Sequence, residues 1–179
     1  MCLSGRLPVT FYAGDCQLPD FSDYSMSGRT YRYFKGKPLY PFGFGLSYTT
    51  FEYDTPVCVT ESPKTGGTVR IASTVRNTGD RTGDEVVQLY ISHPDAPEPK
   101  PIRALKGIKR VTLAPGEEQT VYFELDGRDL SLVDAEGNSV CSPGRVSVYV
   151  GGAQPETDDD TGRQSAIIRI KGGPVVLAK

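Results

Sequence analysis

The chain of 179 residues contains no tryptophan, only one histidine and no long apolar run. A transmembrane helix needs about 20 consecutive apolar residues, so no membrane-spanning segment is predicted. The formal net charge of −2 argues against a nucleic-acid binder and against binding to a membrane surface. The N-terminal residues MCLSGRLPVTF lack the basic region and apolar stretch of a signal peptide, and the sequence leaves localisation open.

Metal-binding signatures are missing as well. The cysteines form no CxxC pair and His93 is the only imidazole, so we predict neither a zinc site nor a cofactor. Four cysteines can pair in three ways, but free, partly buried thiols are the favoured interpretation. Asp158–Asp160 cannot direct three adjacent carboxylates at one calcium ion, so we interpret the polar segment Gly151–Arg163 as a mobile, solvated loop. The cysteines are Cys2, Cys16, Cys58 and Cys141.

The second half of the chain alternates apolar and polar residues with the period of a β-strand. Val69, Ile71 and Val75 share one face of a run, whereas Arg70 and Thr74 share the other. Turn sequences such as NTGD and APGE separate the runs. Roughly six or seven short strands with such turns predict an all-β fold, an antiparallel β-sandwich. The further runs are 87–91, 106–113, 121–125, 146–150 and 166–170.

Several individual residues fit this β-sandwich without implying chemistry. Gly107 is a candidate β-bulge, and the proline-rich segment Pro94–Pro101 is expected to cross from one sheet to the other in an extended form. His93 has no serine or cysteine motif nearby and is interpreted as a residue at a strand end. Three acidic residues are interpreted as turn formers and strand-edge charges, namely Asp80, Asp84 and Glu85.

The first 49 residues break the alternating pattern. The segment Gly28–Phe51 reads GRTYRYFKGKPLYPFGFGLSYTTF, in which glycine and proline punctuate many aromatic residues, so it cannot form an ordinary helix. Leu7–Phe11 is one short strand-like piece, but too few such runs are present for independent folding. We therefore expect an extended arm over residues 1–49, which needs a surface to pack against, and a sandwich over residues 50–179.

Several ordered motifs resemble the C-terminal end of family-3 glycoside hydrolases, the β-glucosidase and β-xylosidase group. SGRLPVTF at Ser4–Phe11 is similar to the segment that follows the α/β sandwich domain of that family. GRTYRYF at Gly28–Phe34 and PLYPFGFGLSYTTF at Pro38–Phe51 are similar to its linker. VRNTGDRTGDEVVQLY at Val75–Tyr90 and LKGIKRV at Leu105–Val111 resemble its fibronectin type III-like domain. The resemblance covers essentially the whole chain.

The resemblance implies that residues 1–49 are the tail of the α/β sandwich domain plus a linker, and that residues 50–179 are a fibronectin type III-like (immunoglobulin-like) domain. It also implies a parent enzyme that removes terminal β-linked glucose or xylose by a retaining mechanism. That mechanism needs two carboxyl groups about 5 Å apart. The family's nucleophile lies in a Ser-Asp-Trp context, which a chain without tryptophan lacks, and its acid/base glutamate lies upstream. We expect no catalytic or substrate-binding residue here and no activity of the chain alone.

The expected partners are the catalytic domains of the parent hydrolase or a partner chain, with an oligosaccharide as a further candidate. Met1 stands where the family's second domain is still ending, which implies a truncated reading frame, an engineered fragment or a stand-alone remnant. The alternative function is a stand-alone carbohydrate-binding or protein-interaction β-sandwich module.

Three interpretations fit the aromatic residues of the arm. They pack between domains, they stack on a sugar ring, or they complete the core of the sandwich itself. We favour inter-domain packing, since sugar-binding platforms rely on tryptophan and none is present. The residues assigned to inter-domain packing are Tyr31, Tyr33, Phe34, Tyr40, Phe42, Phe44 and Tyr48.

Overall fold

The alternating runs form two antiparallel sheets in the computed structural model, which describes residues 3–155 and 165–177. In the first sheet, β3 (Val69–Asn77) lies between β6 (Glu118–Leu125) on one side and the short strands β1 (Phe51–Tyr53) and β2 (Val57–Cys58) on the other. The second sheet has the order β10–β9–β4–β5. Its strands are Ser165–Ile170, Gly144–Gly151, Gly83–Ser92 and Ala104–Leu113, respectively.

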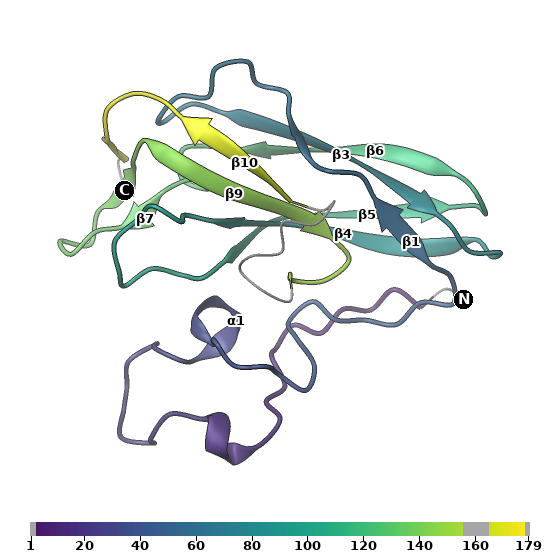
Figure 1. Cartoon of the computed structure of the whole chain (residues 1–179), viewed down its shortest axis with the longest axis horizontal. Coiled ribbons are helices and arrows are strands. Elements are labelled where there is room, and N and C mark those ends of the chain that lie inside the picture. Colours follow the sequence, from purple (N-terminus) through teal and green to yellow (C-terminus); the bar gives the residue numbers. More distant parts are fainter. Residues whose placement is uncertain (1–2, 156–164, 178–179) are drawn as a thin grey trace.

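The two sheets face one another as the layers of a sandwich, and the arm lies beneath the second sheet (Figure 1). A small third sheet, β11–β8–β7, closes one end of the sandwich with strands Val175–Leu177, Ser139–Cys141 and Leu132–Val133. The described part of the chain has only two short helices, a 3₁₀ turn at Asp15–Gln17 and α1 at Thr30–Tyr33. The predicted all-β sandwich is therefore confirmed.

The core lies between the two sheets and consists of the residues predicted to share a face. In β3 the buried positions alternate with exposed or half-buried ones, and β6 shows the same pattern. Removing apolar area from water contributes about 25 cal/mol per Å², so this two-sided layer supplies the main driving force for folding. Its fully buried members include Val69, Ile71, Leu89, Leu113, Leu125 and Val150.

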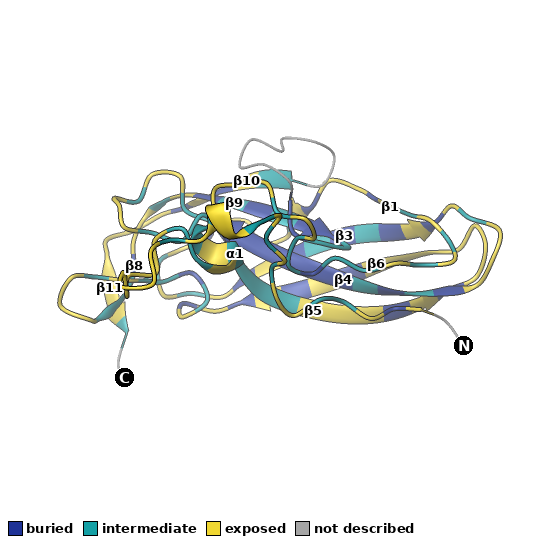
Figure 2. Ribbon diagram, turned by 90° about the horizontal axis from the view of Figure 1, so that it is seen from below, coloured by how far each residue is buried: buried dark blue, intermediate teal, exposed yellow. Residues whose placement is uncertain are grey.

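Strand β4 differs from the other strands because both of its faces are buried from Val87 to Ile91. Val87, Leu89 and Ile91 face the core, while Gln88 and Tyr90 on the opposite face are also buried. A strand covered on both faces needs a third layer. Figure 2 views the molecule from below and shows β4 as a largely buried strand behind α1 and the arm.

The expected β-bulge is present beside Gly107. Leu89 pairs with Gly107 and Tyr90 with Leu105, so one extra residue of β5 interrupts the register between these pairs. A Cβ atom on Gly107 would lie 2.4 Å from the ring of Phe123. Glycine at this position therefore allows the Phe123 ring to pack directly against the β5 backbone.

The expectation for Pro94–Pro101 was wrong. This segment joins β4 to β5, which are neighbours in one sheet, so it does not cross between sheets. The prolines lie outside the ladder, after β4 ends at Ser92 and before β5 begins at Ala104, because proline cannot donate a ladder hydrogen bond. His93 follows the last residue of β4 directly, as predicted for a strand end.

The arm folds back on itself in an open two-stranded arrangement. The Leu7 amide donates to the Phe44 carbonyl and the Gly43 amide to the Leu7 carbonyl, both at 2.8 Å. The Phe11 amide donates to the Tyr40 carbonyl at 2.9 Å. The strand-like piece predicted at Leu7–Phe11 thus pairs with the PLYPFGFG motif.

The remaining expectations concern cysteines, membranes and the acidic segment. Cys16, Cys58 and Cys141 are free thiols, respectively exposed, half-buried and buried. No helix in residues 3–155 or 165–177 is long and apolar enough to cross a membrane. Most of the segment predicted as a mobile loop, including Asp158–Asp160, lies outside the described residues, as does Cys2.

Candidate functional site

The inner side of the arm packs its aromatic rings against the outer face of the second sheet. Tyr31 and Phe42 stack with their ring centroids 4.1 Å apart and an interplanar angle of 15°. Tyr31 also meets Tyr90 of β4 edge to face at 6.2 Å, and its hydroxyl accepts a hydrogen bond from the Leu105 amide of β5 at 3.2 Å. Such pairs add about 0.5–1.5 kcal/mol beyond the area they bury, so these rings attach the arm to the sheet.

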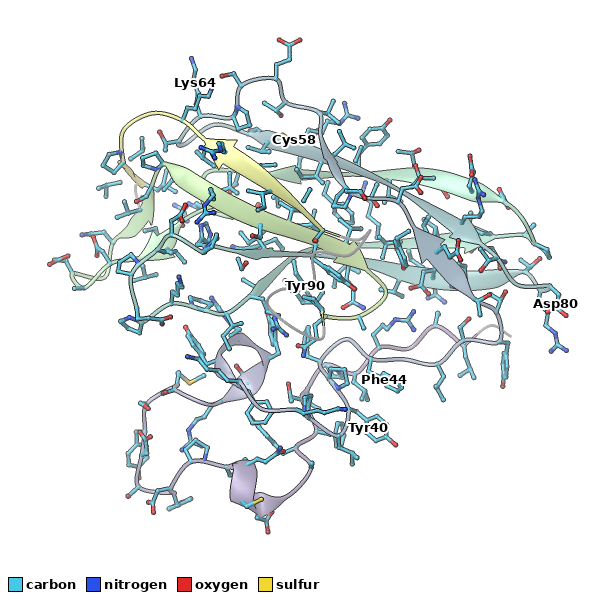
Figure 3. The ribbon with its side chains drawn as sticks, in the orientation of Figure 1. Tyr40, Phe44, Cys58, Lys64, Asp80 and Tyr90 are labelled. Carbon is cyan, nitrogen blue, oxygen red and sulfur yellow. The ribbon has the colours of Figure 1, made fainter. Side chains whose placement is uncertain are left out.

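The outer side of the arm carries a second aromatic group, called here the outer cluster, made of Phe11, Tyr40 and Phe44. Tyr40 lies 6.3 Å from Phe11 and 5.2 Å from Phe44 between ring centroids. Phe11 and Tyr40 remain 46% and 45% exposed. Figure 3 shows Tyr90 on the sheet and Tyr40 and Phe44 farther out on the arm. The outer cluster therefore faces away from the sandwich.

A tight turn at Pro41–Phe44 separates the two aromatic groups. The Phe44 amide donates to the Pro41 carbonyl at 3.2 Å, and Gly43 adopts φ +79° at the third position. This geometry is that of a type II turn, which requires a positive φ at that position. The turn directs Phe42 toward the sheet while Tyr40 and Phe44 stay in contact with each other.

Gly43 also lies against the buried polar residues of β4. The Gln88 side-chain amide donates to the carbonyls of Gly43 at 3.1 Å and Gly152 at 2.7 Å. The Tyr90 hydroxyl donates to the Gln88 carbonyl oxygen at 2.6 Å. A Cβ atom on Gly43 would lie 2.3 Å from that oxygen and 2.8 Å from the Tyr90 hydroxyl. Only glycine permits this approach of the arm to the sheet.

A buried ion pair fixes the start of the arm to both sheets. Arg6 Nη2 donates to Glu85 Oε2 at 2.6 Å, and the Tyr53 hydroxyl donates to Glu85 Oε1 at 2.6 Å. Arg6 Nε also donates to the Gly152 carbonyl at 3.0 Å. The Arg6 and Glu85 side chains are only 12% and 4% exposed. Burial, together with the adjacent Glu85 carboxylate, raises the pKa of Tyr53 far above its usual value.

The expectation for Glu85 as a strand-edge charge was therefore wrong. Glu85 is buried because Arg6 and Tyr53 satisfy its carboxylate, and a buried carboxylate without partners would be costly. The other two acidic residues fit their assignment better. Asp80 lies in the β3–β4 turn region and is exposed, while Asp84, at the second position of β4, pairs with Arg110 of β5 at 2.7 Å.

The structure thus divides the residues assigned to inter-domain packing. Tyr31 and Phe42 face the sandwich, whereas Tyr40 and Phe44 belong to the outer cluster. The half-buried Phe34 packs edge to face on Tyr12 at 4.8 Å within the arm. Two further residues complete the set, the half-buried Tyr33 beneath Arg32 and the 64% exposed Tyr48.

Sequence reasoning missed Arg6, Glu85, Gln88 and Tyr90 as contact residues for the arm. The signal available was EVVQLYI within β4, where apolar and bulky residues occupy both faces of one strand. Such continuity is typical of a strand covered on both sides. Within residues 3–155 and 165–177, no three histidine, cysteine, aspartate or glutamate side chains gather as a metal site.

The comparisons with known proteins agree with this architecture. A model of the fibronectin type III-like domain matches residues 85–154. The chain is 41% identical over 155 residues to a xylan 1,4-β-xylosidase of Xylanibacter ruminicola, covering 86% of this chain and 18% of that protein. It is 35% identical to a periplasmic β-glucosidase of Salmonella typhimurium, covering 83% and 21%. The chain corresponds to the C-terminal part of a family-3 glycoside hydrolase.

Solved structures of β-glucosidases extend the likeness to the arm. The β-glucosidase of Kluyveromyces marxianus superposes with a TM-score of 0.82 at 28% identity, over 98% of this chain and 22% of that one. β-Glucosidase 3B of Thermotoga neapolitana gives 0.80 at 30% identity, over 98% and 26%. The family-3 chain thus spans about a fifth of the length of the curated relatives that it matches.

Proposed function

We propose that this chain is the accessory, non-catalytic C-terminal region of a hydrolase that removes terminal β-linked glucose or xylose from oligosaccharides. The relatives that carry the names β-xylosidase and β-glucosidase support this assignment, since the chain matches about a fifth of their length. By resemblance, hydrolysis would be a retaining reaction with both catalytic carboxylates outside this chain. The buried carboxylate described above does not substitute for them, because Glu85 is already bonded to Arg6 and Tyr53.

The outer cluster is the observation that carries the structural role. The Tyr40 ring contacts the rings of Phe11 and Phe44, yet Phe11 and Tyr40 remain nearly half exposed. Exposed apolar groups of this kind mark protein–protein contact sites, and aromatic residues are enriched in such interfaces. We therefore assign the outer cluster to a surface of the catalytic domains, with the sandwich holding the arm in position from the other side.

A chimera tests this role. The matching region of the Xylanibacter ruminicola xylosidase is replaced by this chain, and thermal stability and xylosidase activity are measured. The double substitution Phe11→Ser and Tyr40→Ser should lower the melting temperature of the catalytic part by several degrees, because it removes two buried rings from the interface. The matched control is Val57→Ser and Val59→Ser. These residues lie in and directly after β2 of the first sheet, away from the arm, and are 60% and 48% exposed. Equal melting temperatures for the two variants would refute the docking role.

The absence of catalysis is tested separately with the purified chain. Incubation with an aryl β-glucoside and an aryl β-xyloside should give no turnover above buffer, because two carboxyl groups across a sugar-binding cleft are required. Turnover that follows the protein through purification would contradict the proposal.

A carbohydrate-binding module is the second candidate, favoured by the highly exposed rings of Tyr24 and Tyr48, at 89% and 64%. Aromatic faces of this kind can stack on sugar rings. Retention on insoluble cellulose or xylan that is lost in a Tyr24→Ala and Tyr48→Ala variant would support it. A clean flow-through of the unmodified chain would leave the docking role as the better explanation of these rings.

A further inference from the structure

The most exposed large apolar side chains lie on one short loop of the arm. Residues 19–28, called here the tip loop, lie between the 3₁₀ turn at Asp15–Gln17 and α1, on the side of the arm away from the two sheets (Figure 1). Phe21 and Tyr24 of this loop are 93% and 89% exposed, more than any other large apolar side chain in residues 3–155 and 165–177.

One arginine at the end of the tip loop holds its backbone in place. Arg29 Nη2 donates to the carbonyls of Asp23 at 2.6 Å and Asp20 at 3.2 Å, and Arg29 Nε donates to the carbonyl of Ser25 at 3.1 Å. The planar guanidinium group is preorganised to make several such bonds at once. Arg29 is therefore a positioning residue for the tip loop.

Two aspartates add local turns and negative charge to the tip loop. The Ser22 amide donates to Asp20 Oδ1 and the Ser25 amide to Asp23 Oδ1, both at 2.8 Å, which is the geometry of an Asx turn. Hydrogen bonds from Ser22 lower the pKa of Asp20, and those from Ser25 lower the pKa of Asp23. Each charged carboxylate directly precedes one of the two exposed rings.

The base of the tip loop is strained and fixed from both ends. Thr30, just after the loop, has φ +55°, which is rare for a β-branched residue, and its amide donates to the Tyr12 hydroxyl at 3.0 Å. Before the loop, the Gln17 side-chain amide donates to the Lys37 carbonyl at 3.0 Å. Strained conformations persist where surrounding contacts hold them, and they cluster at functional sites.

These contacts keep the two rings in solvent. A flexible loop would turn its aromatic side chains onto apolar surface of its own chain, whereas the tip loop presents them outward. A phenylalanine or tyrosine ring buries about 150–250 Å² in a contact, and a loop already held in its binding conformation loses less entropy on association. The tip loop therefore has the features of a preorganised protein-binding element.

We propose that the tip loop is a second anchor for the catalytic domains of the parent hydrolase, which receive Phe21 and Tyr24 in an apolar recess with a positively charged group at its rim. This chain spans only about a fifth of its curated relatives, so most of such a protein is available to cover the loop. The positive rim complements Asp20 and Asp23. The inference rests on the docking role proposed above but uses residues outside the outer cluster.

The positioning role of Arg29 is tested on the isolated chain by ¹⁵N relaxation. Order parameters over residues 20–26 should be near those of rigid backbone, about 0.85. Arg29→Lys keeps the charge but loses the planar group, so these values should fall below about 0.6. Arg32→Lys is the matched control, since the Arg32 side chain is exposed on α1, and it should leave them unchanged. Equal order parameters in the two variants would overturn this role.

The anchor itself is tested in the chimera with the Xylanibacter ruminicola xylosidase. Phe21→Ser together with Tyr24→Ser should lower the melting temperature of the catalytic part by several degrees, because two buried rings are lost from the interface. The same pair should leave the melting temperature of the isolated chain unchanged, because both rings are exposed there. The Val57→Ser and Val59→Ser pair again serves as the control.

A second variant of the chimera tests the charge. Asp20→Asn together with Asp23→Asn keeps the side-chain oxygens that accept the turn hydrogen bonds but removes both charges. The melting temperature should fall less than with the ring substitutions and should depend less on salt, because salt screens the lost attraction. Equal salt dependence with and without the two charges would exclude the positively charged rim.

The outcomes separate this inference from the docking role of the outer cluster. If the ring variant of the tip loop behaves like the control while Phe11→Ser with Tyr40→Ser destabilises the chimera, the docking role stands and the tip loop is not an anchor. If neither variant lowers the melting temperature, both proposals fail. An unchanged melting temperature with a raised KM for an aryl β-xyloside would identify the tip loop as a substrate contact instead and would also overturn the inference.

Discussion

Replacing Arg6 by methionine tests the attachment of the arm to the sandwich. Methionine keeps most of the apolar length of arginine but removes the charge that pairs with Glu85. The Glu85 side chain is 4% exposed and would keep only the Tyr53 hydroxyl as a partner. Removing one partner of a buried ion pair costs about 3–5 kcal/mol, and the remaining hydrogen bond favours the lower end, about 3 kcal/mol. For a chain of this size, that corresponds to a fall in melting temperature of about 6–12 °C.

Two controls isolate the buried charge as the cause. Arg76 forms an ion pair with Glu118 in which the side chains are 57% and 52% exposed, so Arg76→Met should cost less than about 1 kcal/mol. In the double variant Arg6→Met and Glu85→Gln the charge is gone and the Tyr53 hydroxyl still has an acceptor. This variant should recover more than half of the lost stability.

Thermal unfolding monitored by circular dichroism measures the global effect. Amide exchange at Leu7 and Gly43, whose amides bond within the arm, measures release of the arm alone. The reasoning is refuted if Arg6→Met behaves like Arg76→Met in both measurements, or if Glu85→Gln does not rescue it.

Three further predictions follow from individual contacts. Gly43→Ala should loosen the arm and destabilise the protein by about 1–3 kcal/mol, because a Cβ atom would meet Gln88 and Tyr90 at a φ of +79°; unchanged exchange at Leu7 would contradict this. Burial lowers the pKa of His93 from 6.5 to about 4 in the folded protein. The unfolded chain therefore takes up the proton first, and stability should be lost as the pH falls from 6.5 toward 4, by at most about 3 kcal/mol. His93→Asn should flatten the stability curve over that range, and an unchanged slope would show that other groups cause the loss. Amide exchange should be fast over residues 20–29 but slowed at Leu7 and Phe11, whose amides are hydrogen-bonded to the returning strand; uniform exchange over the arm would contradict its docking.

The sandwich could be predicted from the sequence because each strand has its own local pattern. Alternation in β3 and β6 identifies the core face directly, since buried and exposed residues follow one another at period two. The connection at Pro94–Pro101 could not be predicted in the same way. Proline excludes a ladder position but does not say whether the next strand lies in the same sheet or in the opposite one.

The contacts of the arm were not predictable for a different reason. Arg6 and Glu85 are 79 positions apart, and their pairing depends on where the arm folds back over the second sheet. A single sequence gives no distance between such residues. Glu85 therefore carried the ordinary expectation for a charged residue, which is exposure, and only the tertiary arrangement reverses it.

The direction of the aromatic rings depends on one turn. Tyr40, Phe42 and Phe44 alternate along the chain, so an extended segment would place all three on the same face. The turn at Pro41–Phe44 changes this, because Gly43 takes a positive φ and Phe42 reaches the Tyr31 ring instead. Inter-domain packing and packing on the sandwich were treated as competing interpretations of the arm. Phe42 lies on the inner side of the arm and Tyr40 on the outer side, so one segment offers a separate surface for each interpretation. Under the proposed docking role, the sandwich would fix the conformation in which the outer cluster meets a partner domain.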